Sequence, residues 1–416
     1  CSSVSPTSDW RPRPARAPAE HAPPDRQPGA TPRGLAGLGT FSVVKPEPLE
    51  VVTTSRFFDG TSIRGGTAVT LRHGVIESID GHDGPWDHHL LSPGFLDLQM
   101  NGYDAVNCAG TGPGIDRDSL AALDSTLFGR GTTKWFATLV TDDLDRVVSR
   151  TAAIEDSRDS APGCVGVHLE GPFLGSRLGA HNPSRVLPPD HGFAHAPPSG
   201  TRLVTTGAEH PDSPGFIREL VGNAIVVSLG HTAPDRGQWD ECVRSGASMV
   251  THLFNAMPGV HHREDTMALL ALVDERVRFG LIADLVHVSR EALALAFAAA
   301  PDRACLVSDS VAWNDTASQR AGIRLRDGAP RLPDGTLAGS STTLAECVRN
   351  VVRHCGVDLA VALRAATVVP AGIVGMTDDV VPSPGRVANL VALDESLCVT
   401  AAWRALQSVR DLAPLS

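Results

Sequence analysis

Four residues that could bind a metal or transfer a proton each lie at or just after the end of an apolar stretch. They are Glu170, His231, His252 and Asp309. Two imidazoles and a carboxylate are a common ligand set for a catalytic divalent metal, and they leave a coordination position open for water. Asp309 could accept a proton from that water and later return it to a departing group. The pattern therefore predicts metal-assisted hydrolysis.

Amide hydrolysis would use both parts of this set. A divalent metal brings the pKa of water toward neutrality, and an amine leaves well only after it has been protonated. A single histidine among the 16 of this chain is more often an ordinary hydrogen-bonded residue than a metal ligand. Four polar groups that follow four separate apolar runs are much harder to obtain by chance, so we favour the metal site.

The apolar runs alternate with helical patterns, which is typical of an α/β fold. In one such pattern, Ser289 can cap a helix with its body at 292–300, and Pro301 would end it. Eight strand-like runs predict a (β/α)8 TIM barrel, whose strands all end on one face and would bring the four polar groups together. The runs are 94–98, 134–140, 164–169, 202–206, 224–229, 248–252, 277–283 and 304–308.

The two ends of the chain have a different pattern. Short strand-like runs with intervening turns indicate a small flanking β-sandwich built from 46–93 and 376–416, around a catalytic barrel at 94–375. Residues 1–45 are rich in Pro, Ala and Arg and lack periodicity, so we expect a disordered or atypical extension.

Composition excludes several classes of protein. The formal net charge of -11 argues against nucleic acid as the main partner, and an anionic substrate would need locally placed positive groups. The sequence has no apolar run of about 18 residues, so we expect no membrane span. The 8 cysteines are scattered without a CxxC pair, which favours reduced thiols and a cytoplasmic location.

Several segments together resemble the N-acetylglucosamine-6-phosphate deacetylase family of the amidohydrolase superfamily. The resemblance runs from about Ser55 to Leu393, and it implies a metal-dependent barrel enzyme. It is carried by LSPGFLDLQMNG (91–102), HLEGPF (168–173), GAHNP (179–183), GHT (230–232), THLFNAM (251–257), HRE (262–264) and GTLAGS (335–340). HLEGPF and THLFNAM are specific as a pair, although neither would identify the family alone.

The resemblance implies roles for the catalytic residues. Glu170, His231 and His252 would hold the metal, and Asp309 would be the general base and then the general acid. His181 would contact the substrate and help to polarise the acetyl carbonyl. Without the family, His181 in its loop beside Gly179 and Pro183 would have no better than even odds of a functional role.

The resemblance also implies a phosphate site. The backbone N–H groups of Asn255 and Ala256 would face the phosphate, and His287 would face the substrate. Arg263 would reach the substrate of the neighbouring subunit, which implies a homodimer. Each residue also has an ordinary alternative, since Asn255 could cap a helix, His287 could be a core histidine, and Arg263 lies in a loop of mixed charge.

The first predicted strand bears on the number of metals. Many amidohydrolases have His-x-His at this place and bind two metals, whereas this chain has Gln99 and Asn101. Residues two apart on a strand face the same way, and neutral amides are weak ligands for a zinc-like ion. We therefore expect one divalent metal per subunit, with Zn²⁺ the first candidate and Fe²⁺ another.

The expected reaction is hydrolysis of N-acetyl-D-glucosamine 6-phosphate to D-glucosamine 6-phosphate and acetate. Deacetylation of a related hexosamine phosphate, such as the galactosamine epimer, or hydrolysis of another N-acyl compound remains an alternative. A non-catalytic barrel that serves as a scaffold is a further alternative. It is disfavoured because such proteins usually lose metal ligands, and this chain keeps all three together with Asp309.

Overall fold

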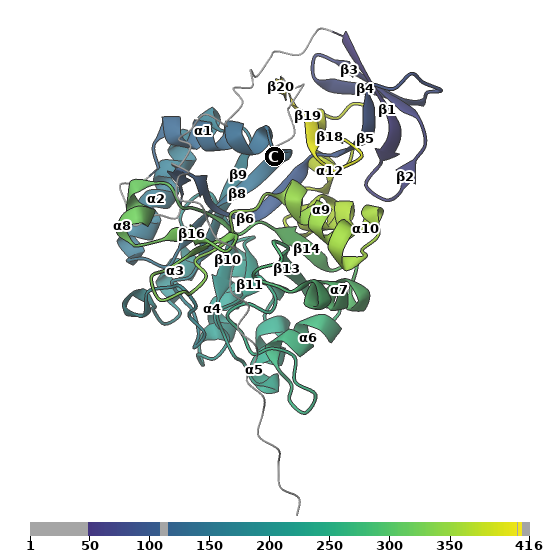
Figure 1. Ribbon diagram of the computed structural model, residues 1–416. Coiled ribbons are helices and arrows are strands. Elements are labelled where there is room, and N and C mark those ends of the chain that lie inside the picture. The colour runs from purple at the N-terminus through teal and green to yellow at the C-terminus, as the bar shows by residue number, and fades with distance from the viewer. Residues whose placement is uncertain (1–48, 109–114, 406, 410–416) are drawn as a thin grey trace, which may run out of the picture. The chain divides into compact units, whose positions relative to one another are not determined.

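The structure is a computed structural model that describes residues 49–108, 115–405 and 407–409 (Figure 1). The extension predicted at 1–45 lies outside these residues. Within them, no helix has both the length and the apolar character needed to cross a membrane.

One large sheet contains eight parallel strands that neighbour one another in chain order. All eight predicted runs are confirmed as strands of this sheet. They are β6 (Phe95–Asp104), β8 (Thr132–Val140), β9 (Cys164–Glu170), β10 (Thr201–Thr206), β11 (Val226–Leu229), β12 (Ala247–Val250), β13 (Arg278–Ile282) and β14 (Ala304–Val307). The chain is therefore an α/β protein with a parallel sheet.

The chain that follows the last of these strands lies beside the first. β15 (Ser310–Ala312) pairs in parallel with β6, with Ser310 opposite Met100, while the short β7 (Val106–Asn107) pairs antiparallel with β6. The backbone N–H of Asp309 donates to the carbonyl oxygen of Gln99 at 2.9 Å. These bonds place the end of β14 against the middle of β6.

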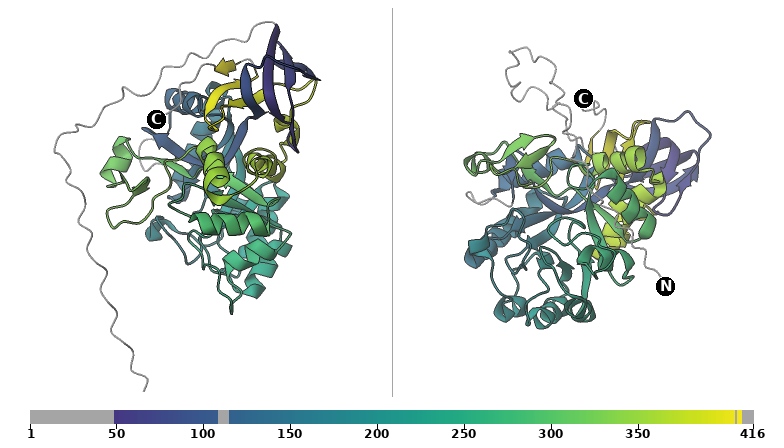
Figure 2. Two further views of the ribbon diagram at one scale, coloured as in Figure 1. Left: turned by 45° about the vertical axis from the view of Figure 1, so that its right-hand side comes forward. Right: turned by 60° about the horizontal axis from the view of Figure 1, so that its bottom comes forward.

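Helices connect the strands of the parallel sheet and pack against it (Figures 1 and 2). The predicted helix at 292–300 is confirmed as α7, with the Ser289 hydroxyl accepting from the N–H of Ala292 and Ala300 as the last cap residue before Pro301. The helices are α1 (Arg117–Phe128), α2 (Leu144–Ser157), α3 (His191–His195), α4 (Ser213–Gly222), α5 (Arg236–Arg244), α6 (Met267–Val273), α7 (Arg290–Ala299), α9 (Leu344–Cys355), α10 (Leu359–Ala366), α11 (Val368–Ile373) and α12 (Thr377–Val380).

The strand-like runs at the two ends of the chain join in a second sheet. Its central contact is antiparallel pairing of β18 with β5, which places Leu390 opposite Pro93. A buried ion pair connects this sheet to the first, because Arg404 of β19 binds Asp124 of α1 at 2.6 Å. The strands are β1 (Leu49–Phe58), β2 (Ile63–Arg64), β3 (Thr67–Arg72), β4 (Val75–Gly81), β5 (His88–Pro93), β18 (Asn389–Leu393), β19 (Val399–Arg404) and β20 (Gln407–Val409).

A β-bulge interrupts the regular pairing of β6 with β8. Asp97 lies opposite Trp135 and Met100 lies opposite Ala137, so β6 uses one more residue than β8 over this stretch. A bulge re-aims the side chains that follow it, and bulges are common beside functional sites. Here it directs the amide of Gln99 toward the carboxylates of Glu170 and Asp309 at the end of the sheet.

A separate segment, residues 316–339, lies between β15 and α9, and we call it the hairpin segment. It contains α8 (Thr316–Arg320) and an antiparallel hairpin of β16 (Arg324–Arg326) and β17 (Ala329–Arg331). A tight turn follows β17, because the N–H of Leu332 donates to Thr336 O and the N–H of Gly335 donates to Leu332 O. The predicted strand and helix pattern did not include this hairpin.

Candidate functional site

Three side chains predicted as ligands meet where the parallel strands end. Glu170 Oε1 lies 3.1 Å from His231 Nε2 and 3.0 Å from His252 Nε2, and the two imidazole nitrogens are 3.0 Å apart. All three side chains are buried. Together with Asp309 they form what we call the strand-end cluster. Its side chains are separated by dozens of residues in the sequence but lie close together in space.

The backbone at these strand ends is held in an unusual conformation. His231, His252 and Asp309 have φ values of 52°, 32° and 47°. A non-glycine residue in this region costs about 1–3 kcal/mol and persists only where the surroundings impose it, often at functional sites. Before His231 the chain needs glycine, because a Cβ at Gly230 would lie 2.7 Å from Thr205 Cγ2.

The donor set fits a divalent cation. His231 Nδ1 lies 3.1 Å from the carbonyl oxygen of Arg177, which can only accept, so Nδ1 carries the proton and the Nε2 lone pair faces the cluster. Lone pairs on Glu170 and His231 at this separation repel unless a proton or cation lies between them. Ligand atoms of a tetrahedral Zn²⁺ site are about 3.3 Å apart, which is near the spacing observed here.

His181 lies beside this group. One ligand atom from each of Glu170, His181 and His231 falls within 4.8 Å of the others, so these residues form a group that could hold a metal ion. The rings of His181 and His231 meet edge to face, with centroids 4.3 Å apart. Loss of hydration and then the neighbouring His231 lower the pKa of His181 to about 3, which keeps its ring neutral.

The two carboxylates of the cluster differ in pKa. Burial raises the pKa of Glu170, but the close approach of His231 and His252 outweighs burial and holds its pKa well below the usual range. Burial and the nearby negative charge of Glu170 raise the pKa of Asp309 to about 8. Neighbouring carboxylates with pKa values pushed apart are typical of acid–base sites.

Two amides orient Asp309. Asn101 Nδ2 donates to Asp309 Oδ1 at 2.7 Å, and Gln99 Nε2 donates to the same oxygen at 3.0 Å and to Glu170 Oε1 at 3.1 Å. Gln99 and Asn101 thus face the cluster as predicted. With Oδ1 fixed in this way, Asp309 Oδ2 has no hydrogen bond from the part of the chain that the structure describes.

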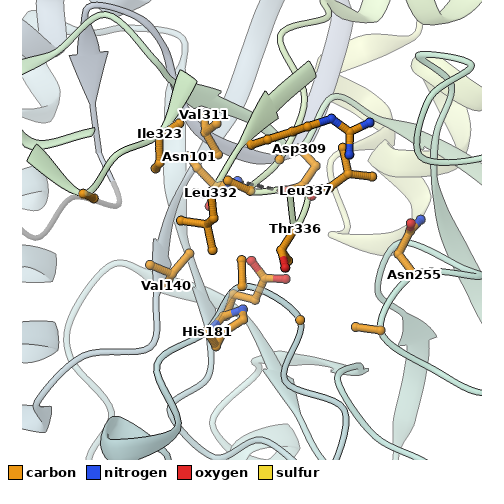
Figure 3. Close-up of a pocket in the computed structure, with 18 of the residues that line it drawn as sticks. Asn101, Val140, His181, Asn255, Asp309, Val311, Ile323, Leu332, Thr336 and Leu337 are labelled. Atoms are coloured by element: carbon orange, nitrogen blue, oxygen red, sulfur yellow. Dashed lines mark hydrogen bonds between the residues drawn. The ribbon is translucent and has the colours of Figure 1, made fainter. Parts of the chain in front are cut away.

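The cluster opens into a cavity of about 600 Å³. Its walls include the hairpin segment as well as the strand ends. Figure 3 shows apolar side chains, Val140 and Leu332 among them, on one side of Asp309, and Asn255 on the opposite side. Asp309 therefore lies between an apolar side of the cavity and the side that carries Asn255.

The residues predicted to bind phosphate are only partly brought together. Asn255, Ala256 and His287 line the cavity, and Asp284 holds His287 Nδ1 at 2.7 Å. The backbone N–H of Asn255 donates to His252 O at 2.9 Å, whereas the N–H of Ala256 has no acceptor among the described residues. Arg263 is exposed on its loop, where its Nε donates to His262, and it is not among the described residues of the cavity wall.

Most cavity residues outside the strand-end cluster were not predicted from the sequence. Thr141 contacts His181 Nδ1 through its hydroxyl at 2.8 Å, and Arg331, Leu332 and Thr336 of the hairpin segment line the cavity. One signal was available, because GTLAGS at 335–340 was among the segments that carried the family resemblance. It was given no role, since nothing in its residue types indicates chemistry.

No family model matches this chain. N-acetylglucosamine-6-phosphate deacetylase of Bos taurus is 32% identical over 76% of this chain and 82% of its own length. N-acetylgalactosamine-6-phosphate deacetylase of Escherichia coli is 31% identical, covering 76% of this chain and 87% of its own.

Solved structures agree with these relatives. A mutant N-acetyl-D-glucosamine-6-phosphate deacetylase of Mycobacterium smegmatis, in complex with N-acetyl-D-glucosamine 6-phosphate, superposes with a TM-score of 0.78 at 26% identity. The superposition covers 88% of this chain and 100% of that one. The similarity therefore extends over both sheets and the helices between them.

Proposed function

The chain belongs to the N-acetylglucosamine-6-phosphate deacetylase family, and from this we propose that it hydrolyses N-acetyl-D-glucosamine 6-phosphate to D-glucosamine 6-phosphate and acetate. The observation that carries the proposal is the meeting of Glu170, His231 and His252 beside Asp309 in one cavity. Such a set provides both parts of amide hydrolysis, a metal site and a separate proton carrier.

A single divalent metal completes this site. Glu170, His231 and His252 would hold it, with His181 within reach of the same position. When bound, the metal polarises the acetyl carbonyl and acidifies water. We favour Zn²⁺, with Fe²⁺ the other candidate, and we favour one ion because the amides at 99 and 101 are engaged with carboxylates.

Asp309 moves the proton. Its Oδ2 accepts a proton from the attacking water, and the same atom then donates that proton to the nitrogen that leaves. Gln99 and Asn101 hold Oδ1, so Oδ2 keeps one orientation throughout. A carboxyl whose pKa is raised to about 8 can return a proton near neutral pH, and the positive charge of a bound metal would favour the ionised form that accepts one.

His181 stabilises the oxyanion. If the Thr141 hydroxyl donates to Nδ1, the proton of the neutral ring is on Nε2, which can donate to the acetyl oxygen as negative charge develops there. The low pKa of His181 keeps the ring neutral, so the hydrogen bond with Thr141 decides which nitrogen carries the proton.

The direct test is an assay of purified protein with metal analysis of the same sample. We expect acetate and D-glucosamine 6-phosphate in equal amounts, about one metal per chain, and a preference in kcat/KM for the 6-phosphate over N-acetyl-D-glucosamine. A metal-free protein without activity would favour the scaffold alternative. Equal kcat/KM values for the two sugars would show that the enzyme does not recognise the 6-phosphate.

The galactosamine epimer is a second candidate. It is favoured by two relatives, 31% and 30% identical, that are named N-acetylgalactosamine-6-phosphate deacetylases. A comparison of kcat/KM for the two epimeric 6-phosphates would decide between them. A ratio above one for the galactosamine compound would make it the preferred substrate.

We propose that the parallel sheet closes as a (β/α)8 barrel at 94–375. The hydrogen bonds that join the end of β14 to β6 support this closure. We propose that the second sheet is the small flanking β-sandwich, built from 46–93 and 376–416. A cytoplasmic location is supported by the described cysteines, all of which are unpaired.

We propose a homodimer in which Arg263 serves the neighbouring site. Arg263 is exposed on its own chain, as such a role would require. Complementation tests this arrangement. An Asp309→Asn chain lacks its own acid–base group but supplies Arg263, while an Arg263→Met chain keeps Asp309. If Arg263 acts across the interface, mixing the two variants restores activity. If it acts within its own chain or not at all, mixing restores nothing.

A further inference from the structure

One cation of the cavity wall has no assigned role. Arg331 ends β17 and is the one arginine or lysine among the described residues that line the cavity. Its Nη1 donates to the carbonyl oxygen of Gly335 at 3.0 Å, whereas its Nε is buried without a hydrogen-bond partner. No carboxylate of the described residues lies within ion-pair distance of it.

Such a charge is unusual in this setting. The chain has a formal net charge of -11, so carboxylates for pairing are plentiful. This guanidinium is nevertheless half-buried beside the cavity without a paired carboxylate. A buried charge is normally paired, and an unpaired donor costs free energy unless something else accepts from it. An anion that enters the cavity would supply an acceptor for the Nη2 N–H groups, which have none among the described residues.

The position of Arg331 indicates which part of a substrate it would contact. The guanidinium donates a hydrogen bond to Gly335 O, and the next residue, Thr336, lies beside Asp309, with Asn255 across the cavity from both (Figure 3). Asn255 marks the end of the cavity where the phosphate is expected. The backbone N–H of Asn255 is occupied by His252, which leaves the N–H of Ala256 and the ring of His287 as the donors from the strand ends.

We propose that Arg331 binds the phosphate group of the substrate within the same chain. This inference rests on the proposed function, since it requires a phosphorylated substrate. A guanidinium presents a planar set of donors that matches phosphate oxygens, and its charge persists at every physiological pH. The hairpin segment then supplies recognition of the anion, while the strand-end cluster supplies the chemistry.

The alternative is that Arg331 only stabilises the hairpin through Gly335. The two roles are separated by measuring each variant on N-acetyl-D-glucosamine with and without the 6-phosphate. Arg331→Met keeps a stem of similar length and removes the charge. Arg326→Met is the matched control, because Arg326 is an exposed arginine on the neighbouring strand of the same hairpin and does not line the cavity.

Arg331→Met should lower kcat/KM for the phosphorylated sugar about 10- to 100-fold, mainly through KM, which is the range for loss of a hydrogen bond to a charged group. Activity on the unphosphorylated sugar should stay within about two-fold of the parent enzyme. Competitive inhibition by inorganic phosphate should weaken in parallel. Arg331→Lys should recover part of the loss, and Arg326→Met should leave kcat/KM unchanged for both substrates.

Each contrary outcome has a defined meaning. Equal losses on both sugars would make Arg331 a structural residue only, and an unchanged preference for the phosphorylated sugar would remove it from the phosphate site. Either result overturns this inference and leaves the deacetylase reaction in place. If the parent enzyme itself shows no preference for the phosphorylated sugar, the phosphorylated substrate is wrong and the role of Arg331 is overturned with it.

Discussion

The strand-end cluster and the hairpin segment line the same cavity but are built in different ways. Glu170, His231 and His252 have side chains that are 4–6% exposed, and several hydrogen bonds fix each strand end. Arg331 and Leu332 of the hairpin segment are half-exposed and are positioned by a short local turn. The sheet holds the groups that must be placed accurately. We assign recognition of the phosphate to the hairpin segment, a connecting segment that can vary without disturbing those groups.

The largest expected effect comes from removing the metal. Chelation should abolish turnover, and added Zn²⁺ should restore it, because the strand-end cluster then has only repelling lone pairs at its centre. Thermal unfolding should shift to lower temperature on chelation, since the metal binds only the folded site. His231→Asn should reproduce both effects, whereas His73→Asn, in an exposed turn with φ of 49°, should not. Full activity of a metal-free preparation would contradict the site.

The next largest effect is expected at Asp309. Asp309→Asn keeps the side-chain shape and removes the proton carrier, so kcat should fall by about 10²- to 10⁴-fold with metal content unchanged. Asp80→Asn, on exposed strand β4, is the control and should have parental rates. Loss of metal together with rate would instead make Asp309 a ligand, and near-parental rates would remove its role as acid and base.

Sequence patterns predicted the strand-end cluster because its physical signal is regular. Buried parallel strands are apolar runs, their ends share one face, and His231, His252 and Asp309 stand directly after such runs. Even the contacts of Gln99 and Asn101 with this cluster followed from alternation along a strand. The bulge that places Gln99 was not predicted, since an added residue changes pairing with β8 and leaves no mark in composition.

The hairpin segment was out of reach for a physical reason. Its strands have three residues each, and β16 is fully exposed, so neither has the periodicity of a buried element. Arg331 is far from Glu170 in the sequence, and its place in the same cavity depends on how the turn at 332–336 folds back. The resemblance located GTLAGS but could not show which neighbour of that segment faces the cavity.

A change behind the strand ends tests how firmly the sheet holds them. Asp97 Oδ1 accepts from the N–H groups of Gln99 and Ser308, and burial raises the pKa of Asp97 to about 6. The folded protein therefore holds this proton more tightly than the unfolded chain. Its stabilising effect is complete below about pH 4 and is lost as pH rises to about 6, a change of about 3 kcal/mol.

Asp97→Asn should remove that dependence, because an amide oxygen can still accept both hydrogen bonds. The free energy of unfolding of the variant, relative to the parent, should rise between pH 4 and 6 and stay constant above. Denaturant unfolding at several pH values measures the difference. A constant difference across this range would mean that Asp97 has an ordinary pKa and that the β6–β14 junction does not depend on its protonation.

The smallest effect is expected in the apolar wall of the hairpin segment. Leu332→Ala removes apolar contact area beside the substrate, so kcat/KM should fall about 3- to 10-fold through KM, with kcat and metal content close to parental values. Leu325→Ala is the matched control, because Leu325 is 49% exposed on the same hairpin and does not line the cavity. A fall in kcat at Leu332 as large as that at Asp309 would show that the hairpin segment also positions the reacting groups. The separation of catalysis in the strand-end cluster from substrate binding by the hairpin segment would then be wrong, since a change in the hairpin segment would also impair catalysis.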